Sequence, residues 1–448
     1  MTPSAPEPDP SPLDDVAFDA VLFDLDGTLV ATDRFWVQAA RTGARRAFAA
    51  LGLERELPSA REWMGLVGQP LDVGFAHLFA DLPDDQRAHV QAACVEEEHR
   101  LLDAGGAAWM PGGEEALAGL VARGVRIGIA SNCSQAYLDH MLERLGIGRF
   151  ATTARCLDSA GIRDKADMIE DQLRVLGTRS AVFVGDRVGD RDAAWANAIP
   201  HVHCAFGFAA LGEEVAAQAH IEDLGELLPT LARRRGWIAS ALERTGVFRP
   251  ACQPPFAVGV TGLPLAGKSL FARDAVAVLR ARGIPSAVLD LADWRRAHGG
   301  GADGEELHDA LDLDRLRADV LTPLSRGEAL SVASIRVDAF GVPSDEVTTL
   351  EPGGVLFLVG EGLLDARFAG SVERTLWLEV SEEECLRRAA GREGRAVGTA
   401  PLEALRGGRL ARALRHRSQC PPERLADLCL AAGNPLGAEA GNPLGAGS

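Results

Sequence analysis

The strongest constraint on the fold of this chain is the regular alternation of short apolar runs with longer helical stretches. The runs AVLFDLD (20–26), VRIGIAS (125–131) and SAVFVGD (180–186) are each followed by a segment rich in Ala, Leu and Arg. Apolar strands that alternate with helices are typical of parallel sheets covered by helices on both faces. We therefore predict an α/β protein built from doubly wound parallel sheets.

A second series of the same kind predicts a second domain. Its runs are FAVGVTG (256–262), SAVLDLAD (286–293), GVLFLVGEG (354–362) and RTLWLEV (374–380). A chain of 448 residues is also too long for one ordinary core. We expect a disordered proline-rich leader, a first domain, a linker, a second domain and a disordered Gly/Pro-rich tail, over residues 1–17, 18–232, 233–256, 257–432 and 433–448.

Composition limits the partners and the compartment. The net charge of -18 makes nucleic acid an unlikely partner, because a basic surface supplies most of the affinity for phosphate backbones. The eight cysteines include no CxxC pair, which favours reduced thiols in the cytoplasm. We find no export signal and no apolar run of the ~18 residues that a membrane span needs. We expect a structural role for His201, His203 and Cys204, since no ligand pair with zinc-site spacing accompanies them.

Lysine is almost absent, and its two occurrences lie in segments suited to phosphate chemistry. Of the 46 basic residues only Lys165 and Lys268 are lysines. A compact ammonium group can sit beside a phosphoryl group as a point charge. The two lysines therefore indicate two phosphate sites.

The first candidate site follows the strands of the first series. Because ligands bind at the carboxyl ends of strands in open α/β sheets, we expect the polar residues there to converge. Two carboxylates at i and i+2 of an extended segment face the same way, so one can attack phosphorus while the other handles protons. Further acids would complete a Mg²⁺ site of hard oxygen ligands. The candidate residues are Asp24, Asp26, Thr28, Ser131, Asn132, Lys165, Asp186 and Asp190.

The motifs DLDGT, SN, K and GDRVGD, in this order, resemble those of the haloacid dehalogenase (HAD) superfamily over residues 18–232. The resemblance implies a nucleophile at Asp24 that forms an aspartyl-phosphate and a general acid and base at Asp26. It implies that the phosphoryl group is held by Ser131 and Lys165, with Thr28 and Asn132 as phosphate contacts. It also implies Mg²⁺ held by Asp24, Asp26, Asp186 and Asp190. An acid at position 26 favours the phosphatase or phosphomutase branch.

A helical insert at about residues 33–110 is similar to the small cap that closes over the substrate in this superfamily. We expect the cap to set specificity for a small phosphorylated metabolite. No pattern in the sequence demands the bisphosphate intermediate of a phosphomutase.

The second candidate site is GVTGLPLAGKS, which fits the pattern G-x-x-x-x-G-K-[ST] with Gly262, Gly267, Lys268 and Ser269. An apolar strand precedes the pattern and a helical stretch follows it. In this context the backbone amides cradle phosphates, the lysine reaches the outer phosphates and the serine ligates Mg²⁺. We therefore predict that this domain binds ATP.

The second series resembles the uridine kinase and phosphoribulokinase group of P-loop kinases over about 257–430. The resemblance implies transfer of the γ-phosphate of ATP to a small hydroxyl acceptor such as a nucleoside or a sugar. The residues concerned are Asp290 and Asp293 as candidate bases, Glu361 as a metal ligand, and Arg387, Arg388 and Arg392 as a lid. One departure is Ala292, which stands where related kinases often carry an acidic residue.

The sequence thus predicts a bifunctional phosphatase and kinase, and two alternatives stay open. The first is nucleic-acid end repair, because polynucleotide kinase-phosphatases combine the same two domain types; the acidic charge argues against it. The second is a phosphatase regulated by a domain that binds ATP without catalysis, for which Ala292 is the clue.

Overall fold

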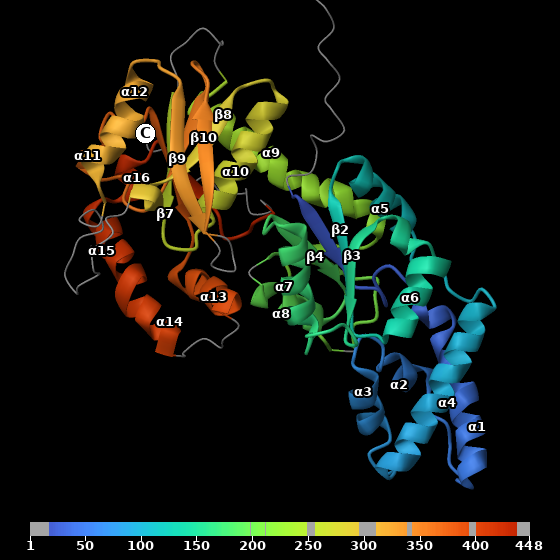
Figure 1. Cartoon of the computed structure of the whole chain (residues 1–448). Coiled ribbons are helices and arrows are strands. Elements are labelled where there is room, and N and C mark those ends of the chain that lie inside the picture. Colours follow the sequence, from blue (N-terminus) through green and yellow to red (C-terminus); the bar gives the residue numbers. More distant parts are fainter. Residues whose placement is uncertain are drawn as a thin grey trace, which may run out of the picture. The chain divides into compact units, whose positions relative to one another are not determined.

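A computed structural model describes residues 18–197, 199–210, 212–248, 256–294, 311–337, 343–393 and 400–436. The chain forms two compact units, with residues 18–231 in the first and the residues from 232 onward in the second (Figure 1). The expected leader and all but residues 433–436 of the expected tail lie outside the described residues. Among the described residues, no helix combines the length and the apolar character needed to span a membrane.

The first unit contains a six-stranded sheet in the order β3-β2-β1-β4-β5-β6, in which every neighbouring pair is parallel. Its strands are Ala20–Phe23 (β1), Arg126–Ser131 (β2), Ala151–Cys156 (β3), Ala181–Gly185 (β4), His201–Cys204 (β5) and Ala219–Ile221 (β6). All residues of β1 and β4 are buried, which explains why these strands read as continuous apolar runs. The predicted α/β class with parallel sheets is confirmed.

Helices cover both faces of this sheet. Helices α7 (Lys165–Leu176) and α8 (Val188–Ala196) lie on one side, and α5 (Gly113–Ala122) and α6 (Gln135–Arg144) lie on the other (Figure 1). Leu22 and Phe183 of the sheet share a core cluster with Met168, Ile169 and Leu173 of α7. The first unit also contains short 3₁₀ turns. η2 (Thr32–Arg34) follows β1, η3 (Ile147–Arg149) precedes β3, and η4 (Leu224–Glu226) follows β6.

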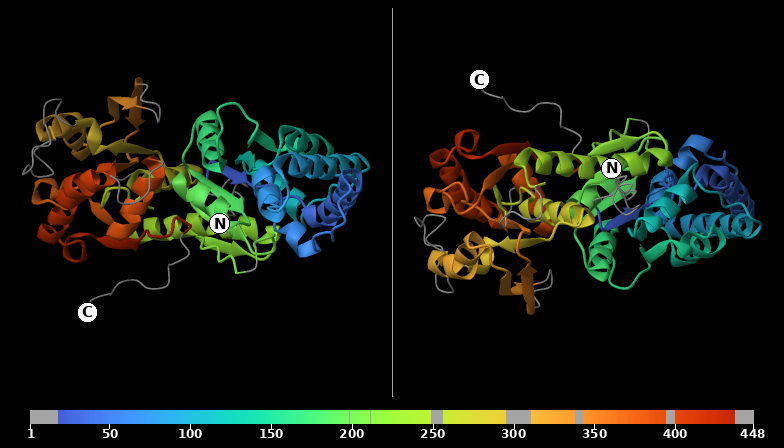
Figure 2. Two further views of the ribbon diagram at one scale, coloured as in Figure 1. Left: turned by 90° about the horizontal axis from the view of Figure 1, so that it is seen from below. Right: turned by 90° about the horizontal axis from the view of Figure 1, so that it is seen from above.

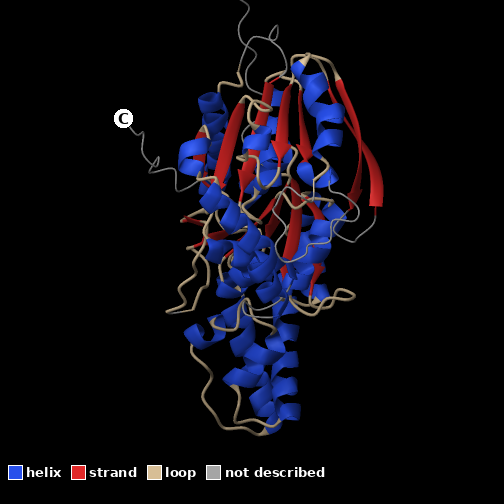
Figure 3. Ribbon diagram, turned by 90° about the vertical axis from the view of Figure 1, so that its left-hand side faces the viewer, coloured by secondary structure: helices blue, strands red, loops and turns tan. Residues whose placement is uncertain are grey.

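The helical insert of the first unit consists of α1 (Trp36–Leu51), α2 (Ala60–Met64), α3 (Leu71–Leu78) and α4 (Asp84–Asp103). Figure 3 shows that this cap is built from helices alone, and both views of Figure 2 show these helices (blue to light blue) grouped together. Helices α1 and α4 pack so closely that a Cβ on Gly43 would lie 2.4 Å from the carbonyl oxygen of Ala93. Glycine is therefore needed where these two helices meet. Four aromatic side chains fill the cap interior, namely Phe48, Trp63, Phe75 and Phe79.

The second unit contains a five-stranded parallel sheet in the order β13-β12-β7-β11-β8. Its strands are Phe256–Gly262 (β7), Ser286–Asp290 (β8), Val355–Val359 (β11), Arg374–Glu379 (β12) and Leu428–Ala431 (β13). A separate antiparallel pair is formed by Leu330–Val337 (β9) and Pro343–Leu350 (β10). The strand that leads into the predicted phosphate loop, β7, is the central strand of the sheet.

The helical elements of the second unit include the long helix α10 (Lys268–Ala281), which directly follows β7 and its loop. The α-helices that follow α10 are α11 (Leu313–Leu316), α12 (Thr322–Ser325), α13 (Glu382–Glu393), α14 (Ala400–Leu405), α15 (Ala411–Gln419) and α16 (Pro422–Leu425). The short 3₁₀ turns are η5 (Leu291–Trp294) and η7 (Ala366–Phe368), and the π-helical turns are η6 (Arg317–Leu321) and η8 (Arg406–Leu410).

The segment expected as a linker, 233–256, is mostly helical. Helix α9 spans Leu227–Thr245, and residue 256 already belongs to β7. Ile238, Ala241 and Leu242 of α9 are buried in the core cluster of the second unit. The sequence analysis predicted a linker here, but apolar residues at helical spacing pack this helix into a core. Residues 249–255 lie outside the described residues.

Candidate active site

The first site begins at the C-terminal end of the central strand β1. Asp24 follows the strand directly, and Asp26 lies two residues further on, in the turn that Gly27 completes. Gly27 has φ +82, and a Cβ at this position would lie 2.3 Å from Oδ2 of Asp186. Glycine is therefore required both by the backbone conformation and by the close approach of Asp186.

The side chains predicted from separate motifs meet at this edge of the sheet. Ser131 ends β2, Asp186 follows β4, and these two strands flank β1. Lys165, the first residue of α7, donates hydrogen bonds to Oδ1 of Asp24 (2.8 Å) and Oδ1 of Asp190 (2.6 Å). All five side chains are buried. One ammonium group thus joins the candidate nucleophile to an acid of α8.

The electrostatics of this cluster follow from burying several acids around one lysine. Burial raises the pKa of Asp24 to about 7, although the charge of Lys165 opposes the shift. Burial likewise raises the pKa of Asp186 well above its usual range, with the charges of Asp190 and Asp24 adding to the shift. Burial opposes ionisation of Asp190 too, but Lys165 outweighs it and lowers the pKa of this acid. The group therefore carries more acid than one lysine neutralises, and an added cation would stabilise its ionised form.

A divalent cation fits this cluster. Ligand oxygens of Asp24, Asp186 and Asp190 lie within 4.8 Å of one another. Oδ2 of Asp24 and Oδ1 of Asp186 are buried and have no hydrogen-bond partner among the described residues, while the second oxygen of Asp186 accepts from the amide of Phe208 (2.6 Å). An all-carboxylate donor set suits Mg²⁺. The described residues contain one further group at this spacing, of mixed donors and in the second unit: Asp365, His416 and Cys420.

The carboxyl group of Asp190 has backbone partners in addition to Lys165. Oδ2 of Asp190 accepts hydrogen bonds from the backbone amides of Asp186 (3.0 Å) and Arg187 (2.9 Å). Asp190 thus holds both the turn after β4 and the ammonium group of Lys165. The carboxyl group of Asp26 is outside the converging group, so its predicted part in metal binding stays a prediction.

Asp26 is held by two hydroxyl groups, neither of which the sequence analysis predicted. Its Oδ1 accepts hydrogen bonds from Thr32 (2.6 Å) and from Tyr137 on α6 (2.5 Å). Burial raises the pKa of Asp26, and the two donors oppose the shift. Burial and the charge of Asp26 raise the pKa of Tyr137 well above its usual range, so this phenol stays a donor. No sequence motif marks Tyr137; the only available signal was that it is the one tyrosine of the chain.

The cap contacts the core beside this site. The side-chain amide of Asn132 donates to the carbonyl oxygen of Gly68 (3.0 Å), and the guanidinium group of Arg187 donates to the carbonyl oxygen of Val67. Arg187 is itself paired with Glu213 (3.0 Å). Asn132 was predicted to contact phosphate, and here it contacts the cap. Thr28, the other predicted phosphate contact, is fully buried in the turn after Asp26.

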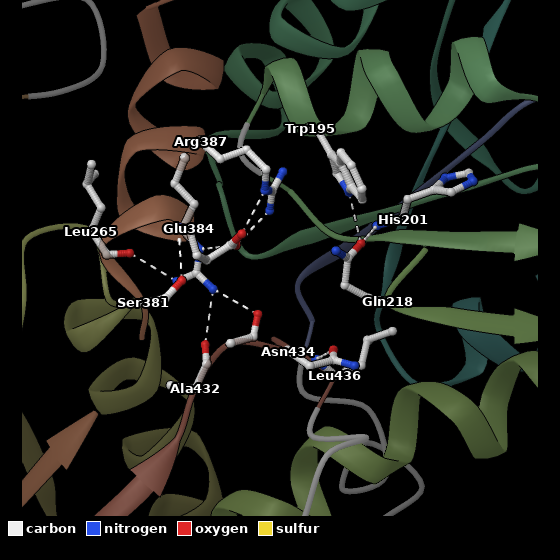
Figure 4. Close-up of polar contacts among 12 residues, drawn as sticks. Trp195, His201, Gln218, Leu265, Ser381, Glu384, Arg387, Ala432, Asn434 and Leu436 are labelled. Carbon is white, nitrogen blue, oxygen red and sulfur yellow. Dashed lines mark hydrogen bonds and ion pairs between the residues drawn. The ribbon is translucent and has the colours of Figure 1, made fainter. Parts of the chain in front are cut away.

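The histidines set aside in the sequence analysis are part of the sheet. His201 is fully buried and stacks on Phe183, and burial lowers its pKa to about 3. Its backbone amide donates to the side chain of Gln218 (2.7 Å), which also accepts from Trp195 (Figure 4). His201, His203 and Cys204 do not belong to either of the metal-compatible groups found among the described residues.

In the second unit, the predicted phosphate loop joins β7 to α10. Gly262 and Gly267 have φ of +152 and +89, and Leu265 between them is the one non-glycine residue with positive φ in the described part of the chain. Lys268 opens α10 and folds back on the loop, where its ammonium group donates to the carbonyl oxygens of Gly262 (3.2 Å) and Leu263 (2.8 Å). The residues of the motif thus form a compact loop at a helix N-terminus.

Acidic side chains from neighbouring strands lie beside this loop. Oδ2 of Asp290, at the end of β8, lies 3.5 Å from the hydroxyl group of Ser269. Glu361, just after β11, lies 3.6 Å from the ammonium group of Lys268 and accepts two hydrogen bonds from Arg409 (2.5 and 3.1 Å). Arg409 is a further residue that the sequence analysis missed. Asp293, the other candidate base, lies in η5, the turn that follows β8.

The three arginines predicted as a lid differ in what the structure describes of them. Arg387 pairs with Glu384 on its own helix (2.6 Å; Figure 4). Arg388 also pairs with Glu384 and donates to the carbonyl oxygen of Leu265 in the loop (3.0 Å). Arg392 lies in α13, and its side chain is outside the described residues. Arg388 is therefore the lid candidate whose contact with the phosphate loop the structure describes.

Comparison with known proteins finds similarity in the first unit. Residues 21–194 match the family of haloacid dehalogenase-like hydrolases. The phosphoglycolate phosphatase of Agrobacterium fabrum is 27% identical over 223 residues, which cover 47% of this chain and 91% of that protein. A haloacid dehalogenase-like hydrolase of Streptococcus pneumoniae is 23% identical with a TM-score of 0.41, covering 48% of this chain and 98% of that one. CbbY from Rhodobacter sphaeroides, in complex with phosphate, is 21% identical with a TM-score of 0.40, and the match covers 47% of this chain and 96% of that one.

Proposed function

We propose that the haloacid dehalogenase-like hydrolase domain at residues 21–194 is a Mg²⁺-dependent phosphomonoesterase that acts through an aspartyl-phosphate on a small metabolite. The observation that supports the proposal most is the position of Lys165, whose ammonium group bonds Asp24 and Asp190. A buried cation at this point neutralises charge on a phosphoryl group attacked by Asp24. Asp186 supplies a further carboxylate for the metal.

Each step of the proposed reaction has a candidate residue. A carboxylate oxygen of Asp24 attacks phosphorus, and the bond from phosphorus to the substrate oxygen breaks. Asp26 donates a proton to the leaving alcohol and then removes a proton from the water that hydrolyses the aspartyl-phosphate. Ser131 and Lys165 hold phosphoryl oxygens. Mg²⁺ held by Asp24 and Asp186, with Asp190 beside them, would neutralise charge on the phosphoryl group.

The reaction can be tested with p-nitrophenyl phosphate and with a labelled phosphomonoester. We expect turnover that depends on Mg²⁺ and, after acid quenching, a labelled phosphoenzyme that is absent from the Asp24→Asn variant. Turnover without a labelled intermediate, or full activity of the variant, would contradict the mechanism.

We propose that the second unit binds the phosphates of ATP at residues 262–269. The supporting observation is that this loop lies between the central strand β7 and the N-terminus of α10, where backbone amides favour anions. Transfer of the γ-phosphate to a hydroxyl acceptor requires a base, for which Asp290 beside Ser269 is the best placed acid in the described structure.

The kinase proposal can be tested in a variant without phosphatase activity. The Asp24→Asn variant is incubated with Mg²⁺, γ-labelled ATP and a panel of nucleosides, sugars and vitamins. A labelled product supports a kinase and supplies a candidate substrate for the phosphatase. Binding of ATP without any labelled product favours the regulatory alternative, and salt-sensitive binding of an oligonucleotide would favour end repair.

A further inference from the structure

The segment 432–436, here called the strap, folds onto the second unit directly after β13. Most of it belongs to the Gly/Pro-rich tail, yet Leu436 is fully buried. The backbone amide of Leu436 donates to the side chain of Asn434 (2.9 Å). The amide of Ala432 donates to the carbonyl oxygen of Glu379 in β12 (2.9 Å). The strap is therefore a docked segment with defined contacts.

Arg388 of α13 joins the strap to the predicted phosphate loop. Its guanidinium group donates to the carbonyl oxygen of Leu265 in the loop (3.0 Å) and to those of Ala432 (3.0 Å) and Gly433 (3.1 Å) in the strap. Figure 4 shows the carbonyl groups of Leu265 and Ala432 directed at this guanidinium group. Nε of Arg388 donates to Glu384 (2.8 Å), and the side chain is only 12% exposed. These protein acceptors suit a brace between two segments better than a ligand of phosphate oxygens.

A second arginine makes the same kind of bridge. Arg234 of α9 donates to the carbonyl oxygen of Pro435 in the strap, and its Nε donates to Oδ2 of Asp274 in α10 (2.7 Å). Both side chains of this ion pair are buried. Helix α10 begins directly at the phosphate loop. The strap is thus bonded through one arginine to the loop and through the other to the helix that continues it.

The loop residue that Arg388 contacts has an unusual backbone conformation. Leu265 has φ +64, in the left-handed region that residues with a side chain rarely adopt. Such a conformation persists where the surrounding contacts enforce it, and it occurs most often at functional sites. The bond from Arg388 to the carbonyl oxygen of Leu265 is one such contact, and it comes from the side of the strap.

On the basis of the ATP site proposed above, we propose that the strap positions the phosphate loop, with Arg388 as the positioning residue. The affinity for ATP then depends on residues 432–436, although they do not contact the nucleotide. A loop that is held in its binding conformation before the ligand arrives loses less conformational freedom on binding. Arginine suits this role because its planar fork can donate to several carbonyl oxygens at once.

The tail supplies a matched control, because GNPLGA at 433–438 recurs at 441–446. The Kd of ATP with Mg²⁺ is measured by isothermal titration calorimetry in the full-length chain. We expect the double variant Leu436→Ser/Leu444→Ser to bind about tenfold more weakly than the wild type. Leu444→Ser alone keeps the docked copy and should retain the wild-type Kd. Deletion of residues 433–440 places the second copy directly after Ala432 and should also retain it.

Arg388→Lys separates a brace from a phosphate ligand. Lysine keeps the charge that a phosphate contact needs, but it cannot reproduce the fork that joins the loop to the strap. We expect a loss of about tenfold, as in the double leucine variant. Because both changes break the same bridge, combining them should weaken binding little further. Arg374→Lys is the control, since Arg374 begins β12 and pairs with Asp427 (3.7 Å).

Circular dichroism without nucleotide checks that each variant is folded at the temperature of the titration. If the double leucine variant is unfolded there, Arg388→Lys decides between the outcomes. Wild-type affinity in Arg388→Lys, losses that add in free energy, or an equal loss in Leu444→Ser would overturn the inference. Failure of the wild type to bind ATP would instead reject the proposed nucleotide site.

Discussion

The hydroxyl group of Tyr137 lies 2.5 Å from Oδ1 of Asp26 and donates a hydrogen bond to it. Thr32 donates to the same oxygen. The two hydroxyl groups come from α6 and from the start of the cap, so the orientation of Asp26 depends on two separate elements of the first unit. Because both donors stabilise the ionised carboxylate, they set the proton affinity of the proposed general acid and base.

Removal of the tyrosine hydroxyl should change the pH dependence of hydrolysis. Tyr137→Phe takes away one donor that opposes the raised pKa of Asp26, so this pKa rises further. We expect the acid limb of the kcat profile to move to higher pH and kcat at pH 7 to fall by about 5- to 10-fold. Thr32→Val should shift the limb in the same direction. An unchanged profile in both variants would show that Asp26 does not titrate in the rate-limiting step.

Asp24→Asn should abolish the phosphatase, because an amide cannot form the aspartyl-phosphate. We expect a loss of at least about 10³-fold in kcat, measured with p-nitrophenyl phosphate. Asp19→Asn is a suitable control, since Asp19 accepts from the Thr178 hydroxyl (2.7 Å) and has no contact with the cluster. Equal losses in the two variants would indicate a general folding defect, which circular dichroism would reveal.

Mg²⁺ should stabilise the first unit against heat. Binding to Asp24 and Asp186 relieves the repulsion among buried acids, and at 100 times the Kd it contributes about 2.7 kcal/mol. We expect the Tm to rise by several degrees in calorimetry, and we expect Asp186→Asn to lose this rise. Asp171→Asn, which changes an acid paired with Arg155 and Arg174, should keep it. The same rise in all three proteins would place the cation elsewhere.

Glu98→Gln should make the stability of the chain less dependent on pH. Burial, with the charge of Asp26, raises the pKa of Glu98 from about 4.5 to about 8. Between these two pH values the folded state keeps a proton on Glu98 that the unfolded state releases. The free energy of unfolding therefore falls as pH rises from about 4.5 to 8. The charge of Glu98 in turn helps to raise the pKa values of Tyr137 and Cys94.

A glutamine side chain does not titrate, so we expect the Glu98→Gln variant to exceed the wild type in unfolding free energy by about 1–2 kcal/mol at pH 8, and by less at pH 5. Urea titrations at several pH values measure this difference. Glu97→Gln should lower stability instead, because Arg46 and Arg100 lose a partner. A difference between wild type and Glu98→Gln that does not grow with pH would contradict the expected ionisation.

Lys268→Met should weaken ATP binding by the second unit by at least about tenfold, because the contact of the lysine with the outer phosphates would be lost. Isothermal titration calorimetry with ATP and Mg²⁺ measures the effect. Arg280→Met is the control, since Arg280 donates to the carbonyl oxygen of Ser286 at the opposite end of α10. If the two variants bind ATP equally well, the loop at 262–269 is not a nucleotide site.

The parts of the site that could be predicted from sequence are those fixed by the edge of a parallel sheet. Asp24 and Lys165 are 141 residues apart, yet their contact follows from the position of β1 between β2 and β4. Gly27 marks the turn because its φ is positive. The same reasoning placed Asp290 and Glu361 beside the phosphate loop. The enzymatic roles of these residues stay predictions until they are measured.

The parts that could not be predicted depend on tertiary packing of helices. Glu97 and Glu98 look alike in the run EEE, and only the packing of α4 decides that Glu97 pairs with Arg46. Tyr137 reaches Asp26 because of the rotation of α6, for which no motif gives a signal. Most of helix α9 was predicted as part of a linker. Its arginines can be read from the sequence, but which of its faces is buried cannot.

The position of Tyr137 has a practical consequence for spectroscopy. The chain contains one tyrosine, and this residue donates to the proposed catalytic acid. Incorporation of a fluorinated tyrosine would therefore give a single ¹⁹F resonance, without background from the rest of the molecule. That resonance would report occupancy of the phosphatase site directly, including for compounds that bind without being hydrolysed.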